Sequence, residues 1–145
     1  MSATCLFCQI ASGTVIGANR IVEFPHSVAV LHFNQSFRGR SILIAKEHCT
    51  DMPALPRAAY AELCEELREF SRALQRSLRP DRINYANFGN VMAHLRWHVI
   101  PSYRHDPRWG RPPTFDDDRS RSSDEPYENL ASVIRGAIRG RGTDL

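Results

Sequence analysis

The chain has 145 residues, of which 42% are hydrophobic and 24% charged, a composition typical of one folded domain and not of a disordered segment. Its formal net charge of +3 is too small to predict a surface of clustered cations for a nucleic-acid polymer. No run approaches the roughly 18 apolar residues of a membrane span, and the N-terminus lacks the basic and apolar regions of a signal peptide. We therefore expect no membrane partner and a cytoplasmic location.

The first half of the chain predicts three strands and a long helix. Short β-like runs cover residues 20–24, 27–32 and 40–46, and the pair Pro25-His26 between the first two is a turn signal. Pro56 fits the first turn of a helix, and Pro80 ends that helix. Its apolar residues recur every three or four positions and form one stripe, made of Tyr60, Leu63, Leu67, Phe70, Leu74 and Leu78.

The second half predicts two more strands, at residues 82–88 and 95–101, and then a surface loop at 104–127 and a short helix at 128–139. Hairpin-length connections imply antiparallel pairing. The order of elements therefore predicts an α+β fold, a five-stranded antiparallel sheet with one long helix packed on a face and a short C-terminal helix. We expect one domain over residues 1–110, with 111–145 as its loop, C-terminal helix and tail.

Three basic side chains alternate along the last predicted strand and the residue just before it. Because side chains alternate along a strand, His94, Arg96 and His98 share one face, spaced about 6.6 Å apart, while the apolar residues between them face the core. The outer two histidines, about 13 Å apart, cannot share a metal ion. The three groups could line a trough for a phosphate ester, and the alternative is a strand whose polar face meets water.

The N-terminal Cys5-x-x-Cys8 pair indicates metal or redox chemistry. Tetrahedral zinc needs two further ligands, commonly histidines, and no His-x-x-x-His follows nearby, so the local motif is incomplete. The alternative interpretation is two buried cysteines that act as small hydrophobic side chains.

The chain resembles the histidine triad (HIT) superfamily of nucleotide hydrolases and transferases over about residues 5–105. The resemblance is carried by CLFCQI at residues 5–10, GRSILIAKEH at 39–48, NYANFGN at 84–90 and HLRWHVIP at 94–101. Trp97, with DPRW at 106–109, is similar to the bacterial branch of diadenosine polyphosphate hydrolases.

One position departs from the family pattern. The family's middle histidine attacks the α-phosphate and forms a nucleotidyl-enzyme intermediate, and in this chain Arg96 stands there. A guanidinium is protonated at any working pH and has no lone pair for phosphorus, so the covalent mechanism should be absent.

Several alternatives for the function stay open. The chain could bind a nucleotide without hydrolysis, as a regulatory module, or act non-covalently, with Arg96 stabilising charge and His98 as general acid or base. It could also be a specialised biosynthetic enzyme with an unusual substrate, and Arg96 could be an introduced substitution.

The resemblance also implies a ligand set. Family members with the Cys-x-x-Cys pair hold structural zinc at positions that match Cys5, Cys8, His48 and His94. The nucleotide positions match Leu31 or Phe33 for the base slot, Asn34 for the ribose, and Asn84, Gly89 and Asn90 for the phosphate. Members of the family are usually homodimers, which we expect here on the same ground.

Overall fold

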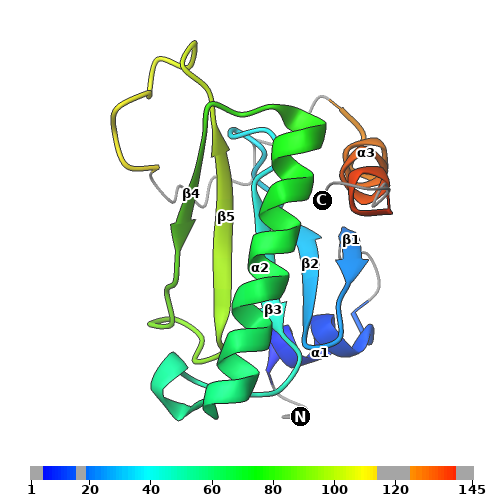
Figure 1. The fold of residues 1–145 in the computed structure, drawn as a ribbon, viewed down its shortest axis with the longest axis vertical. Helices are drawn as coiled ribbons and strands as arrows, with labels where there is room; N and C mark the ends of the chain where they lie inside the picture. The colour runs from blue at the N-terminus through cyan, green and yellow to red at the C-terminus, as the bar shows by residue number, and fades with distance from the viewer. Residues whose placement is uncertain (1–4, 16–18, 114–124, 140–145) are drawn as a thin grey trace.

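The computed structural model of the chain describes residues 5–15, 19–113 and 125–139. Its centre is one five-stranded sheet in the order β1-β2-β3-β5-β4, with every neighbouring pair antiparallel (Figure 1). The strands are β1 (Arg20–Glu23), β2 (Ser27–Leu31), β3 (Ser41–Ala45), β4 (Arg82–Ala86) and β5 (Arg96–Ser102). The predicted α+β class and five-stranded antiparallel sheet are confirmed.

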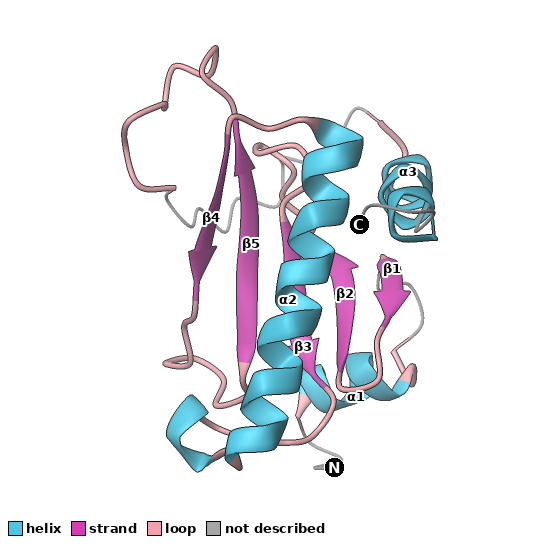
Figure 2. Cartoon of the chain, in the orientation of Figure 1, coloured by secondary structure: helices cyan, strands magenta, loops and turns pink. Residues whose placement is uncertain are grey.

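Helices cover both faces of the sheet (Figure 2). The long helix α2 (Arg57–Leu78) crosses one face, and α3 (Tyr127–Arg139) packs beside α2 and against β1. The two-turn helix α1 (Leu6–Ser12) lies on the opposite face, and the 3-10 turn η1 (Met52–Ala54) precedes α2. Neither α1 nor η1 was predicted, because an element this short shows no recognisable periodicity.

Two apolar clusters fill the space on either side of the sheet. The larger one joins α2 and α3 to Leu95 and to the strand residues that point toward them, among them Ala29, Leu31, Leu43, Trp97 and Val99. The smaller one joins Ala11, Phe7 and Ile10 of α1 to Val28, Val30, Ile42 and Ile44. Since both faces are covered, β2, β3 and β5 are buried along their whole length.

Gly39 sets the approach of β3 to the end of α2. Its φ is +89°, and a β-carbon there would lie 2.3 Å from Leu78 Cδ1 and 3.2 Å from Pro101 Cγ. Only glycine combines this backbone conformation with so close an approach. Within the part of the chain that the structure describes, no helix is both long and apolar enough to cross a membrane.

Candidate functional site

Alternation along β5 separates the core from the candidate site, as predicted. Leu95, Trp97 and Val99 pack in the cluster beneath α2, while Arg96 and His98 point to the other face. There they lie beside Ile44 and Ile42 of β3, their partners in the strand register. His94 and Leu95 precede the first residue of β5, but the carbonyl oxygen of Leu95 still accepts from the N–H of Ala45 at the end of β3, at 3.1 Å.

Arg96 is a buried cation bound to the backbone in front of β5. Arg96 is only 7% exposed. Its Nη1 donates to the carbonyl oxygens of Met92 at 2.7 Å and His94 at 2.9 Å. The guanidinium lies 4.5 Å from the ring centroid of Phe7 on α1, a cation–π contact. Its Nε has no hydrogen-bond partner among the described residues. Burial lowers the pKa of Arg96, and the neighbouring Cys5 opposes that shift.

These contacts correct the expectation of one trough shared by three basic groups. His94 turns to Cys5 and Cys8, and Arg96 to the preceding loop and Phe7. The ring of His98 lies between those of His32 and Phe88, with centroid distances of 6.1 and 6.2 Å. The three side chains share a face of the sheet and have three different surroundings, because α1 packs over the first two positions.

His98 is uncharged at neutral pH. Burial lowers its pKa to about 4, and electrostatic interactions with Arg40, His32 and Arg96 lower the pKa further. An uncharged imidazole can accept a proton, whereas donating one requires that it first be protonated. The lowered pKa therefore favours His98 as a base or hydrogen-bond partner over a general acid at pH 7.

We expect NMR titration of the imidazole resonances to give His98 a pKa near 4 and stability to rise from about pH 4 to 6.5. Because folding lowers this pKa, the unfolded chain binds more protons in that window. The stabilisation is complete above the unfolded value near 6.5 and is lost as the pH falls toward 4, by roughly 3 kcal/mol. His98→Gln, which does not titrate, should remove this part of the pH dependence. Identical profiles for the variant and the wild type would contradict the assignment.

Cys5, Cys8, His48 and His94 form one compact cluster, and their ligand atoms all lie within 4.8 Å of one another. Cys5 Sγ lies 3.4 Å and Cys8 Sγ 3.6 Å from His94 Nδ1, and Cys8 Sγ lies 3.3 Å from His48 Nδ1. In tetrahedral zinc with ordinary bond lengths, sulfur and nitrogen ligands are about 3.5 Å apart. The cluster therefore has the size that a four-coordinate zinc ion needs.

The tautomer of His94 suits a metal as well. Its Nε2 lies 2.8 Å from the carbonyl oxygen of Ala45. A carbonyl can only accept, so Nε2 carries the hydrogen and the Nδ1 lone pair faces the two sulfur atoms. The four residues come from the start of α1, the segment after β3 and the segment before β5, so an ion here would join the outer helix to the sheet.

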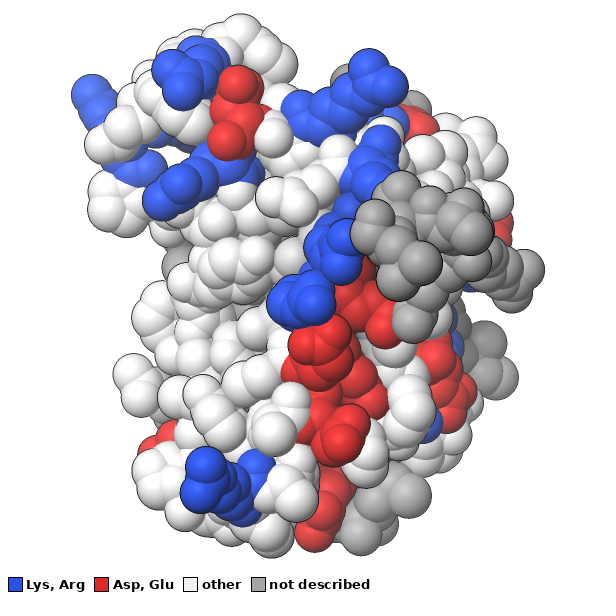
Figure 3. All heavy atoms as spheres, in the orientation of Figure 1, with Lys and Arg blue, Asp and Glu red and all other residues white. Residues whose placement is uncertain are grey.

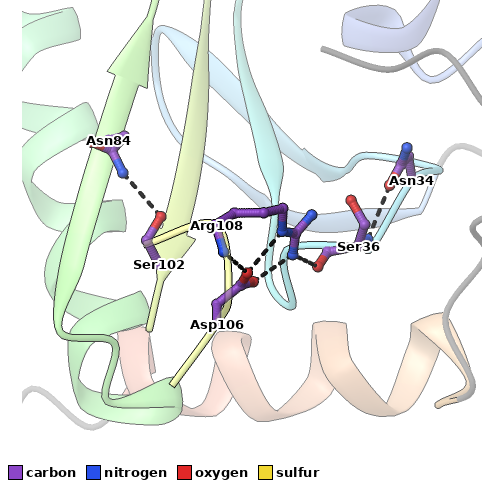
Figure 4. Close-up of polar contacts among 6 residues, drawn as sticks. All are labelled: Asn34, Ser36, Asn84, Ser102, Asp106 and Arg108. Carbon is purple, nitrogen blue, oxygen red and sulfur yellow. Dashed lines mark hydrogen bonds and ion pairs between the residues drawn. The ribbon is translucent and has the colours of Figure 1, made fainter. Parts of the chain in front are cut away.

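The residues matched to the phosphate lie along β4 and the loop that follows it. Asn84 of β4 donates from Nδ2 to Ser102 Oγ at 2.9 Å (Figure 4). Gly89 and Asn90 are in the loop between β4 and β5, on the path to His94. Phe33 is half exposed, and its ring lies 4.3 Å from that of His32.

The structure does not place two of the expected nucleotide residues at this face. Leu31 is buried in the cluster under α2, on the opposite side of the sheet from His98. Asn34 is fully buried, and its Oδ1 accepts from the backbone N–H of Ser36 at 2.9 Å (Figure 4). The backbone N–H of Asn34 donates to His32 Nδ1 at 3.0 Å. Asn34 thus shapes its own loop, and His32 is the residue of this segment that reaches His98.

His32 and Phe7 were missed as site residues. Alternation along β2 could have identified His32, since Val28 and Val30 share its face. Phe7 is on the short helix that no periodicity indicated.

Comparison with known proteins identifies the family of the chain. The family model for the HIT domain matches residues 14–105. An uncharacterised HIT-like protein of Mycoplasma genitalium is 24% identical over 135 residues, covering 90% of this chain and 94% of its own. The adenosine 5'-monophosphoramidase hnt1 of Schizosaccharomyces pombe is 26% identical over 103 residues, covering 68% and 74%. A Zn-bound histidine triad family protein from Mycobacterium smegmatis, 27% identical, superposes with a TM-score of 0.72 over 94% of each chain. The chain belongs to the HIT domain family.

Proposed function

We propose that this HIT protein binds a nucleoside phosphate or a related phosphate ester at the sheet face that carries Arg96 and His98. The observation that carries the proposal is the buried, backbone-bound guanidinium of Arg96 at the centre of this face. It supplies a fixed positive charge where the substrate phosphate of a HIT protein would lie, and it supplies no nucleophile. Turnover would therefore be weak and would run without a nucleotidyl-enzyme intermediate.

Each neighbouring group has a role in such a complex. His98, uncharged at neutral pH, would accept a proton from an attacking water or a hydroxyl group. Backbone N–H groups near Gly89 and Asn90, and the side chain of Asn84, would bind phosphate oxygens. The exposed ring of Phe33 would contact the base.

The relative from Schizosaccharomyces pombe is named for its action on a phosphoramidate. This supports a substrate in which the bond between phosphorus and a leaving group is cleaved. Diadenosine polyphosphates, expected from the bacterial branch, are the second class to assay.

We also propose that Cys5, Cys8, His48 and His94 hold structural zinc. Their spacing, the tautomer of His94 and the Zn-bound relative from Mycobacterium smegmatis support this. A four-ligand site of this kind leaves no open position for substrate, so its contribution would be to stability.

A second candidate, a binding module without turnover, is favoured by one observation. Both described contacts of Arg96 Nη1 go to carbonyl groups of its own loop, so the guanidinium is already engaged. The two candidates share the ligand and differ only in turnover.

Both candidate functions require that the protein bind a nucleotide. Isothermal titration calorimetry with adenosine monophosphate tests this binding. We expect His98→Ala and Arg96→Gln each to weaken binding about tenfold, near 1.4 kcal/mol, because each removes a polar contact to the phosphate. Arg57→Ala, which removes an exposed arginine at the start of α2, should leave binding unchanged. Equal affinities for all three variants would place the nucleotide elsewhere.

A homodimer would fit the surface of α2 and β4. A groove between them is lined by Cys64, Leu67 and Tyr85, and Tyr85 is exposed at the edge of the sheet. Figure 3 shows acidic side chains over the N-terminal part of α2 and arginines over its C-terminal part. Two antiparallel copies of α2 would pair these charges, an arrangement that a two-fold axis permits. We propose this dimer, which light scattering showing a single-chain mass would exclude.

A further inference from the structure

A cavity of about 580 Å³ continues the candidate site along the sheet. Its floor is the outward side of β4 and β5, with Asn84, Ile100 and Ser102. Phe37 and most residues of the loop 103–113 line the rest of the cavity. A volume of this size is typical of small-molecule sites, and none of the roles assigned above uses most of it.

The cavity lies next to His98, and Phe88 and the cross-strand partner Ala86 connect the two. Phe88, whose ring contacts that of His98, also lines the cavity. His98, Ile100 and Ser102 alternate on one face of β5, and Ser102, at the far end of the cavity lining on this strand, lies about 13 Å along the strand from His98. If the phosphate of a ligand lies beside His98, the group attached to that phosphate can therefore extend into the cavity.

The lining has aromatic walls and a cationic far end. Phe88 and Trp109 are 46% and 39% exposed, large apolar surfaces that a ligand would cover. Arg82 pairs with Ser102 across the strands, and Arg111 is on the loop opposite. Neither arginine side chain forms an ion pair with another described residue of the chain. This arrangement suits a planar ring that carries a negative charge at the end remote from His98.

The loop that closes the cavity is held in place before any ligand binds. Arg108 donates from Nε and Nη2 to the carboxylate of Asp106 and from Nη2 to the carbonyl oxygen of Ser36 at 2.7 Å (Figure 4). Its guanidinium lies 3.8 Å from the centroid of Phe37. The hydrogen bonds from Arg108 lower the pKa of Asp106 to about 2, so this pair stays charged over the working range of pH. A preformed wall reduces the ordering cost of binding.

We propose that this cavity binds the leaving side of the substrate, a planar aromatic group that joins the phosphate at His98 to a second anionic group near Arg82 and Arg111. This inference rests on the proposed function for the position of the phosphate. It narrows the substrate class to phosphate compounds with an aromatic anion on the far side.

Three probes of increasing length test it by calorimetry with the full chain: inorganic phosphate, phenyl phosphate and 4-carboxyphenyl phosphate. We expect affinity to rise about tenfold with the ring and again with the carboxylate. Trp109→Ala should remove the gain from the ring and Trp109→Phe should restore most of it. Arg111→Ala should remove the gain from the carboxylate, and the matched control Arg57→Ala should remove neither.

The outcomes separate the cavity from the phosphate site. Unchanged gains in Trp109→Ala and Arg111→Ala, or no binding of the two aryl phosphates by the wild type, would overturn the cavity assignment alone. If His98→Ala leaves the affinity for all three probes intact, the phosphate position is wrong and the connection between the two sites fails with it. Loss of all binding in His98→Ala, with selective losses in the cavity variants, supports both.

Discussion

Replacing Cys8 with alanine is expected to remove zinc from the purified protein and to lower the free energy of unfolding by about 3 kcal/mol or more. Cys8 is buried, and its sulfur lies close to the imidazole nitrogens of both His48 and His94. An ion bound there connects α1 to the segments beside β3 and β5, so its loss frees the outer layer from the sheet. Elemental analysis measures the metal, with about one zinc per wild-type chain expected, and urea denaturation measures the stability.

The matched control is Cys64→Ala, since that thiol is half buried on α2 and belongs to no cluster of candidate ligands among the described residues. It should retain the metal. A chelator separates the metal from simple packing: it should lower wild-type stability toward that of Cys8→Ala and leave the variant unchanged. Wild-type protein that is free of metal and unaffected by the chelator would reject the zinc assignment.

Replacing Arg96 with histidine is expected to raise turnover of adenosine phosphoramidate by about a hundredfold or more and to allow a trapped nucleotidyl adduct. A neutral imidazole has the lone pair that attacks phosphorus, and the guanidinium has none. Continuous assay of product and mass spectrometry of the quenched enzyme measure the two effects.

Arg96→Gln is the control for this gain, because it removes the guanidinium without supplying a nucleophile. Both variants lose the hydrogen bonds to Met92 and His94, so both should be less stable by about 1–3 kcal/mol. Equal turnover in Arg96→His and Arg96→Gln would show that the imidazole at this position has no covalent role.

The sheet and the long helix could be predicted because local patterns encode them. The apolar stripe of α2 and the alternation from Leu95 to Val99 both continue in the structure, with the apolar side of each in the cluster between them. The helix α1 could not be predicted in this way, because seven residues give less than two full periods. Its position decides much of the site, since Phe7 covers Arg96 and Cys5 and Cys8 face His94.

In the candidate site, too, some features follow from local sequence patterns and others do not. Which face Arg96 and His98 occupy follows from strand periodicity, whereas what each of them contacts depends on segments far away in the sequence. The candidate metal ligands His48 and His94 came from the family resemblance, because no local spacing connects them to Cys5 and Cys8. Of the two residues offered for the base slot, Leu31 or Phe33, strand periodicity already argues against Leu31, because it places Leu31 on the side of Ala29 under α2.

The most direct measurement is intact-protein mass spectrometry of the wild-type chain, quenched during incubation with adenosine phosphoramidate and with diadenosine tetraphosphate. With Arg96 in place of the nucleophile, the account predicts the mass of the unmodified chain with both compounds, under conditions in which Arg96→His carries the adduct. A nucleotidyl adduct on the wild-type chain would contradict it.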